Sequence, residues 1–267
     1  MKKITIEKVL IALFLIIFVY SGSQIILWHI DNKKTDKQIK SIKDKVTIKQ
    51  TDDSDKTEII ENNNEQSDPY WDYIKMNLIE VDFNQLKKIN PSTKGWIKVE
   101  GTNINYPFVQ TNNNDYYLTH SFDNSHNGGG WVFLDYRNNL NNEEKNTIIY
   151  AHGRENKTMF GTLKNILSDN WLNNNANHIV KMSTEYENTL WQVFSIYKIP
   201  TTNDYLQIKF QIGEFKSFTD TITNRSFHNF KTTVTDNDRI LTLSTCFNDY
   251  EKVVLHAKLI KREKKWL

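Results

Sequence analysis

The stretch that decides the fold lies near the end of the chain and reads ILTLSTCFNDYEKVVLHAKLI over residues 240–260. Two runs of aliphatic and β-branched residues, at 240–246 and 252–260, flank the short polar sequence FNDYE. Such residues are enriched in strands, and a short polar connection between two such runs is typical of paired strands. We therefore predict two neighbouring strands, the first of which ends at Cys246.

Similar strand-like runs begin at residue 95. They are rich in β-branched and aromatic residues and are separated by clusters of Asn, Asp and Gly: GWIKVE, INYPFVQ, WVFLDY, NTIIYAH and TLWQVFSIYKI. This pattern predicts a β-rich core. Apolar residues at helical spacing predict helices at 71–78, 83–89, 159–167 and 212–222. The last segment has an apolar stripe that we expect to pack in the core, formed by Ile212, Phe215, Phe218 and Ile222.

An apolar segment near the N-terminus predicts a membrane span. A helix of about 20 residues crosses a bilayer, and residues 9–30 are long enough. Lysines at positions 2, 3 and 8 precede the segment. The positive-inside tendency then predicts that residues 1–8 are cytoplasmic and that the rest of the chain lies outside the cell. The alternative is a signal peptide cleaved near residues 21–23, and we favour the uncleaved anchor.

The segment that follows is polar. Residues 31–68 are mostly Lys, Asp, Glu, Asn, Gln, Ser and Thr, with scattered Ile and Val. Such a composition buries too little apolar area to offset chain entropy. We expect a solvated stalk over residues 31–68 and one folded domain over residues 69–267.

Charge and cysteine content exclude several functions. The 267 residues include 34 Lys and Arg and 32 Asp and Glu, for a net charge of +2. A net charge this close to zero does not indicate the basic surface that nucleic-acid binding requires, and we predict no nucleic-acid partner. A single cysteine allows no intramolecular disulfide. No residue spacing resembles a zinc site or an EF-hand, so we predict neither a metal nor another cofactor.

The single cysteine is a candidate nucleophile. Cys246 lies where a strand opens into a loop, which fixes its backbone and suits a nucleophile, although a buried structural cysteine is the alternative. A thiol with a pKa near 8.5 is mostly protonated at neutral pH and needs a base or a nearby cation. His152 is the predicted partner, because it follows the strand-like run 147–151 where that run opens into a loop. His256, on the strand after Lys252, is the second candidate.

Four blocks together resemble a known family. They are TLSTC at 242–246, YAHG at 150–153, FLDYRN at 133–138 and GWIKVEGTNINYPFVQTNNNDYYLTH at 95–120. In their order along the chain they are similar to class B sortases, the membrane-anchored cysteine transpeptidases of Gram-positive bacteria. The resemblance implies a mainly β fold: an eight-stranded barrel with N-terminal helices and a helical insertion before the catalytic strand. It also implies that residues 69–267 are an extracellular catalytic domain.

The resemblance further implies a reaction and its partners. Cys246 would attack the carbonyl of Thr in a sorting signal similar to Asn-Pro-x-Thr-Asn/Gly, borne by a surface protein. An amine of a peptidoglycan precursor would then resolve the thioester, with His152 as acid and base. The groove that binds the sorting peptide would be lined by Asn114, Leu118, Ser244 and Thr245.

One position departs from the family pattern. The family has an essential Arg at the start of the strand after the cysteine, where this chain has Lys252. Lysine supplies a positive charge but lacks the planar fork of arginine, and we predict that Lys252 takes the Arg role. Arg239 is about 23 Å from Cys246 along the same strand, whereas Arg154 is close to His152 in sequence and stays open as a substitute. Arg262 is at the far end of the last strand, and Arg137 and Arg225 lie on loops or insertions.

Two alternatives follow from the missing Arg. One is a catalytically impaired module that binds sorting signals without cleaving them. The other is a hydrolytic cysteine peptidase of the cell envelope, for which water would be the preferred acceptor.

Overall fold

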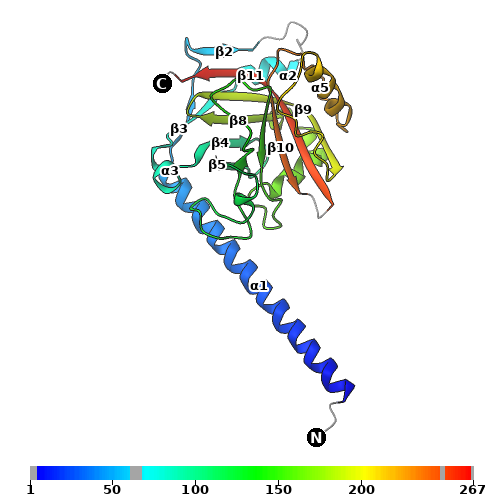
Figure 1. Ribbon diagram of the computed structural model, residues 1–267. Helices are drawn as coiled ribbons and strands as arrows, with labels where there is room; N and C mark the ends of the chain where they lie inside the picture. Colours follow the sequence, from blue (N-terminus) through cyan, green and yellow to red (C-terminus); the bar gives the residue numbers. More distant parts are fainter. Residues whose placement is uncertain (1–4, 61–67, 247–249, 266–267) are drawn as a thin grey trace.

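The computed structural model describes residues 5–60, 68–246 and 250–265, except for the side chains at positions 68 and 246. A long N-terminal helix, α1 (Ile6–Lys45), projects from a β-rich domain (Figure 1).

The domain is a closed barrel of eight strands. In spatial order they are β10 (Ile240–Cys246), β7 (Asn146–Tyr150), β6 (Phe133–Leu134), β5 (Asn105–Val109), β4 (Thr93–Val99), β8 (Ile179–Thr184), β9 (Glu187–Pro200) and β11 (Glu251–Lys264). β11 pairs back with β10 and closes the ring. The predicted eight-stranded barrel is thereby confirmed, as are the two neighbouring strands at the end of the chain.

The barrel encloses an aromatic and aliphatic core. Trp96, Phe108 and Trp191 come from three different strands and are fully buried. Burying one such side chain stabilises the fold by about 1.5–3 kcal/mol. The strand-like runs form strands because their apolar side chains are buried inside the closed sheet.

The first predicted helix has different bounds, whereas the second agrees with the prediction. α2 (Asp68–Ile74) ends before residue 78, where β3 (Leu78–Val81) begins. The reason is tertiary: β1 (Ile48–Thr51) supplies an antiparallel partner for β3. α3 (Asn84–Ile89) forms as expected, and the Asp82 carboxylate accepts the Asn84 N–H at 2.9 Å at its start.

The remaining helical segments frame the barrel. The insertion before β10 is α5 (Glu214–Asn224), in which Phe215, Phe218 and Ile222 are buried. The prediction for Ile212 was wrong: this side chain is fully exposed, because it precedes Gly213, whose left-handed φ of 81° begins the helix. The segment predicted at 159–167 is a 3₁₀ helix, η2 (Gly161–Leu167). The other short helical elements are η1 (Tyr116–Leu118), α4 (Asp169–Leu172) and η3 (Asn175–Asn177).

The segment expected to be a solvated stalk differs from that expectation. α1 continues without a break to Lys45, and three of its residues are buried against the domain: Asn32, Thr35 and Ile42. β1 pairs with β3, and β2 (Thr57–Ile59) pairs with the outer edge of β11. Hydrogen bonding by polar side chains and backbone orders this segment, together with the packing of its few apolar residues, such as Ile42, in the core. The divisions of the chain at residues 8, 30 and 68 stay predictions.

Candidate active site

Strand pairing brings three predicted site residues to one end of the barrel. Ser244 of β10 lies opposite Tyr150 of the parallel strand β7. Two residues beyond this pair, Cys246 ends β10 and His152 lies in the loop after β7. Across the antiparallel pair, Cys246 lies opposite Lys252 of β11. Adjacent strands are about 4.8 Å apart, so the backbones at these three positions are close neighbours.

A cavity of about 280 Å³ opens at this end of the barrel. It is lined by six of the predicted site residues: Asn114, Leu118, His152, Ser244, Thr245 and Lys252. The structure therefore brings together residues that are far apart in the sequence. The seventh, Cys246, has its backbone in β10, but its side chain lies outside the described part of the chain.

The His152 side chain has a defined contact. Its Nε2–H donates to the Leu118 carbonyl oxygen at 2.8 Å. The neighbouring segment has a glycine at 130 with a left-handed φ of 58°, where a Cβ would come within 2.4 Å of the Tyr117 oxygen and 3.0 Å of His152 Cδ2. Glycine there lets the chain pass close to the imidazole.

Comparisons with known proteins agree with this geometry. Residues 97–260 match the sortase domain family. Sortase B of Staphylococcus aureus (strain NCTC 8325 / PS 47) is 36% identical over 188 residues, covering 68% of this chain and 76% of that protein. The solved structure of a Staphylococcus aureus sortase B–substrate complex has a TM-score of 0.62 at 36% identity, covering 67% of this chain and 84% of that one. For Clostridium perfringens sortase B the TM-score is 0.63 at 34% identity, covering 67% and 100%.

The chain is a class B sortase. Membership of this family makes the protein a cysteine transpeptidase.

Residues that the sequence did not predict complete the cavity of this sortase. They include Phe133, Tyr150 and most of the segment 201–206 between β9 and α5. The Tyr205 hydroxyl lies 2.9 Å from Ser244 Oγ, and both residues are buried. The 201–206 segment has neither periodicity nor a motif, so only the folded chain reveals its place.

A buried carboxylate holds the walls of the cavity together. Asp135 accepts hydrogen bonds from Arg137 Nε and Nη2 at 2.8 Å each, from the Tyr150 hydroxyl at 2.8 Å and from Asn114 Nδ2 at 3.1 Å. Burial alone would raise the pKa of Asp135, but the hydrogen bonds, chiefly from Arg137, outweigh it and lower that pKa. Arg137 also donates to the Leu206 carbonyl at 3.0 Å. The FLDYRN block at 133–138 was the available signal for this cluster.

His256, the second candidate for the base, is structural. It is fully buried, with its ring nitrogens 2.8 Å from the Tyr197 hydroxyl and 2.9 Å from Thr242 Oγ1. Burial, with a smaller contribution from Arg225, lowers the pKa of His256 to about 3. It is therefore neutral at physiological pH and is absent from the described lining of the cavity.

The five arginines of the sortase have partners of their own, and none is among the described residues that line the cavity. Arg154, which sequence reasoning left open, donates to Thr35 Oγ1 at 2.8 Å and to Asn32 Oδ1, both on α1. The others pair with carboxylates: Arg137 with Asp135, Arg225 with Asp204, Arg239 with Glu187, and Arg262 with Glu58 and Glu143. Among the described residues that line the cavity, Lys252 is the one Lys or Arg.

Proposed function

We propose that this sortase cleaves a sorting signal similar to Asn-Pro-x-Thr-Asn/Gly after its Thr and transfers the acyl fragment to an amine of a peptidoglycan precursor. Surface proteins would thereby become covalently attached to the cell wall. The observation that supports the proposal is the strand register: Ser244 and Tyr150, each two residues before Cys246 and His152, are paired, and Cys246 is paired with Lys252.

In the first half-reaction, Cys246 forms a thioester. His152 takes the thiol proton, and the sulfur attacks the carbonyl carbon of Thr, so that a C–S bond forms. When the tetrahedral intermediate collapses, the C–N bond breaks and the imidazolium of His152 gives its proton to the leaving amine. The acyl fragment stays on the enzyme.

In the second half-reaction, an amine replaces the thiolate. The amine nitrogen attacks the thioester carbon, and His152 accepts the proton that the nitrogen loses. A C–N bond forms, the C–S bond breaks, and the Cys246 thiolate leaves and recovers the proton from His152. The enzyme returns to its starting state, and the acceptor carries the surface protein.

Lys252 takes the part that Arg has in the family. An ammonium at the start of β11 can donate to the oxyanion that forms during both steps, although as a single point charge. Removing one oxyanion donor costs about 10² to 10³ in rate. A lysine in this position is therefore expected to sustain a slower enzyme rather than an inactive one.

The groove residues bind the sorting peptide. Thr245 supports this role, because its Oγ1 is buried and has no hydrogen-bond partner among the described residues. A buried hydroxyl without a partner costs free energy, and a peptide amide or carbonyl in the cavity would satisfy it. Asn114, Leu118 and Ser244 line the same cavity.

The membrane topology belongs to the same proposal. The apolar part of α1 has an 18-residue window of mean hydropathy 2.4, none of which is buried in the protein. Because the helix runs on into residues that are buried against the domain, an uncleaved anchor is favoured over a signal peptide. Residues 1–8 would be cytoplasmic and the catalytic domain, residues 69–267, extracellular.

The products of one reaction test the proposal against its alternatives. The full chain in detergent is mixed with a peptide containing Asn-Pro-Gln-Thr-Asn, with and without triglycine. We expect cleavage after Thr and a new Thr–Gly amide when triglycine is present. Uncleaved peptide that stays bound would favour the impaired binding module. Cleavage with water as the acceptor in excess triglycine would favour the hydrolytic peptidase.

A further inference from the structure

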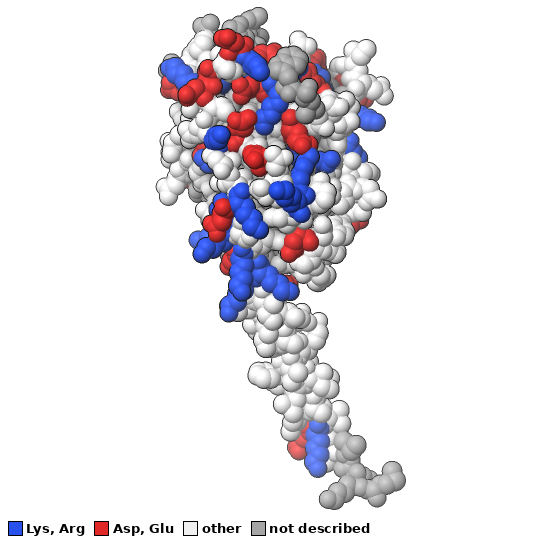
Figure 2. All heavy atoms as spheres, turned by 90° about the vertical axis from the view of Figure 1, so that its left-hand side faces the viewer, with Lys and Arg blue, Asp and Glu red and all other residues white. Residues whose placement is uncertain are grey.

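A group of polar side chains in this sortase is buried beside the peptide-binding cavity. Figure 2 shows acidic and basic side chains intermingled on one face of the domain, where they meet solvent. Four polar side chains are instead buried between the barrel and the insertion that carries α5: Asn146, Tyr197, Thr242 and His256. None of these four takes part in the proposed reaction, so their burial needs another reason.

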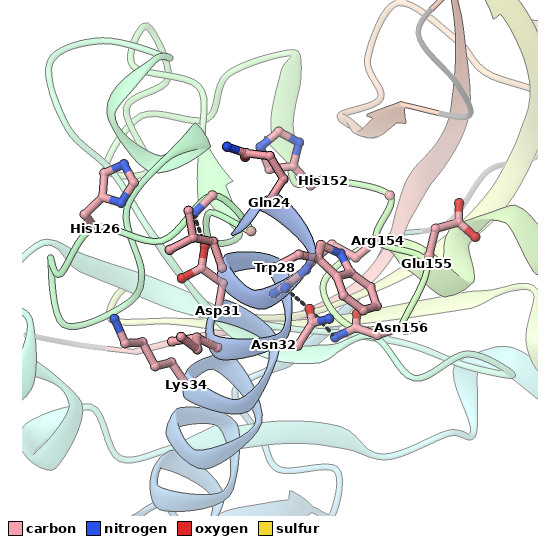
Figure 3. Close-up of a pocket in the computed structure, with 15 residues that line it drawn as sticks. Gln24, Trp28, Asp31, Asn32, Lys34, His126, His152, Arg154, Glu155 and Asn156 are labelled. Atoms are coloured by element: carbon pink, nitrogen blue, oxygen red, sulfur yellow. Dashed lines mark hydrogen bonds between the residues drawn. The ribbon is translucent and has the colours of Figure 1, made fainter. Parts of the chain in front are cut away.

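Two segments that line the cavity are held in different ways. The loop that carries His152 is attached to α1, because Arg154 and Asn156 both donate to Asn32 Oδ1 (Figure 3). The segment 201–206 contains no helix or strand, and all of its residues except Asp204 line the cavity. Its shape must therefore be set by side chains from outside the segment.

One end of this segment is held through Asp204. The Asp204 carboxylate accepts hydrogen bonds from both terminal nitrogens of Arg225, with Nη1 at 3.1 Å. These hydrogen bonds lower the pKa of Asp204, which is ionised at neutral pH. Arg225 also donates to the Tyr197 hydroxyl, and its Cζ lies 5.9 Å from the centroid of the Tyr197 ring. Arg225 thus connects the segment to β9.

The other end is held through Asn146. Its Nδ2 donates to the Gln207 carbonyl at 2.8 Å, and its Oδ1 accepts from Thr242 Oγ1 at 2.8 Å. A threonine hydroxyl has a single proton. Thr242 Oγ1 must therefore accept from His256 Nδ1, which lies 2.9 Å away. The geometry assigns to His256 the tautomer with its proton on Nδ1.

His256 joins the two halves into one continuous series of hydrogen bonds. Its unprotonated Nε2 accepts from the Tyr197 hydroxyl at 2.8 Å. The series begins and ends next to the same segment, and we call it the wall network: Asp204, Arg225, Tyr197, His256, Thr242, Asn146 and Gln207. Buried polar networks whose members all have partners make a structure rigid.

We propose that the wall network, with His256 at its centre, is a positioning device that sets the shape of the peptide-binding segment 201–206. The inference rests on the proposed function and adds to it the residues that hold this segment in its binding conformation. Arg225, Tyr197 and His256 are positioning residues, because none of them is among the described residues that line the cavity. Breaking the network should weaken binding of the sorting peptide and leave the chemistry at Cys246 intact.

Arg225→Ala tests this role by kinetics with the full chain in detergent. For the Asn-Pro-Gln-Thr-Asn peptide we expect KM to rise at least about fivefold, with kcat within about twofold of the parent. Alkylation of Cys246 by iodoacetamide, which needs no peptide site, should keep its rate. A general folding defect would instead lower kcat through the fraction of active enzyme and leave KM unchanged, which would overturn the proposal.

Arg239→Ala is the matched control. Arg239 also donates to both oxygens of a carboxylate, that of Glu187, and its Cζ also lies 5.9 Å from an aromatic centroid, that of Trp191. It is not a member of the wall network, and its replacement should leave KM for the peptide within about twofold of the parent. A rise in KM as large as that of Arg225→Ala would overturn the specific role of the network.

A second variant tests whether the members act as one unit. Tyr197→Phe removes the hydroxyl between Arg225 and His256 and should also raise KM. If both changes break one network, the double variant should have the KM of the more severe single variant, because effects within a network are not additive. Two effects that multiply, or an unchanged KM in both single variants, would overturn the proposal.

Hydrogen exchange examines the segment without any substrate. The amides of Thr201 and Leu206 donate to the carbonyls of Tyr250 and Asn203 at 2.9 and 3.0 Å. In Arg225→Ala they should exchange about tenfold faster or more, whereas Arg239→Ala should leave their rates unchanged. Parental rates in Arg225→Ala would overturn the positioning role. A parent that does not cleave the peptide would instead refute the proposed function, and the exchange rates would still decide whether the network holds the segment.

Discussion

At the residue scale, much of the site is recognisable in the sequence. Cys246 and His152 each follow a strand-like run, and in the structure their positions lie two residues beyond the same registered pair. Asp135 was missed as a site component, because its importance comes from the hydrogen bonds it accepts from Arg137, Tyr150 and Asn114. A residue whose role is to hold other site residues in place cannot be recognised from a single sequence, because its partners are known only from the structure.

Lys252 is the residue whose role is most open to a direct test. Because Lys252→Ala removes the one Lys or Arg among the described lining residues of the site cavity, we expect kcat/KM for the sorting peptide to fall about 10² to 10³-fold. Lys252→Arg should match or exceed the parent, because the planar fork can donate two parallel hydrogen bonds. Steady-state kinetics of both variants measures this. Undiminished turnover by Lys252→Ala would contradict the assignment, and Lys198→Ala, on the neighbouring strand, is the control.

Thr245 offers a finer test of substrate binding. Thr245→Val keeps the shape of the side chain and removes a hydroxyl that has no partner among the described residues. If the peptide supplies the partner, the variant should bind it about 1 kcal/mol more weakly, seen as a higher KM, while the free enzyme should be at least as stable to heat as the parent. An unchanged KM would show that the hydroxyl serves no substrate.

At the scale of elements, helix and strand patterns were informative where local sequence decides the structure. The amphipathic segment that became α5 was recognised, as were the runs that became β10 and β11. The polar segment after residue 30 was expected to be solvated, yet α1 continues through it and docks through Asn32, Thr35 and Ile42. Composition indicates the amount of apolar burial, whereas this docking combines a single buried Ile42 in the core with polar partners that come from distant loops.

The docking of α1 should affect catalysis through the loop that carries His152. Arg154, two residues after His152, is tied to Thr35 and Asn32. Arg154→Ala should lower kcat, by up to about 10²-fold if the imidazole shifts by 1 Å, with KM for the sorting peptide nearly unchanged. Arg154→Lys should restore part of kcat, and Lys33→Ala, on the exposed face of α1, is the matched control. A rise in KM with kcat unchanged would contradict a positioning role.

At the scale of the whole molecule, barrel closure was anticipated through the family resemblance. The strand-like runs predict β structure but not which strands are neighbours, and closure depends on β11 pairing with both β9 and β10. Figure 1 shows the result, a barrel attached to one long helix. The cavity that contains His152 and Lys252 lies at one end of this barrel.

The barrel also contains two buried histidines that should make its stability depend on pH. Burial is the main cause that lowers the pKa of His256 to about 3 and that of His178 to about 4, against about 6.5 in the unfolded chain. The unfolded state therefore binds more protons in this window, so stability is fully present above pH 6.5 and falls as the pH decreases towards 4. Denaturant midpoints of the full chain between pH 7 and pH 4 should show this loss.

Substitution separates these histidines from other acid-sensitive groups. His178→Gln should flatten the dependence between pH 6.5 and pH 4, whereas His126→Gln, at an exposed position, should leave it unchanged. An equally steep loss in both variants would exclude His178 as a contributor.

The most direct test of the central claim is the intact mass of the enzyme during a single turnover with the Asn-Pro-Gln-Thr-Asn peptide. We predict that the protein gains the mass of the acyl fragment ending in Thr, that peptide mapping locates it on Cys246, and that triglycine removes it. His152→Ala should form this adduct far more slowly. Cleavage of the peptide without any adduct, or an adduct on another residue, would contradict the assignment of Cys246 as the nucleophile of this sortase.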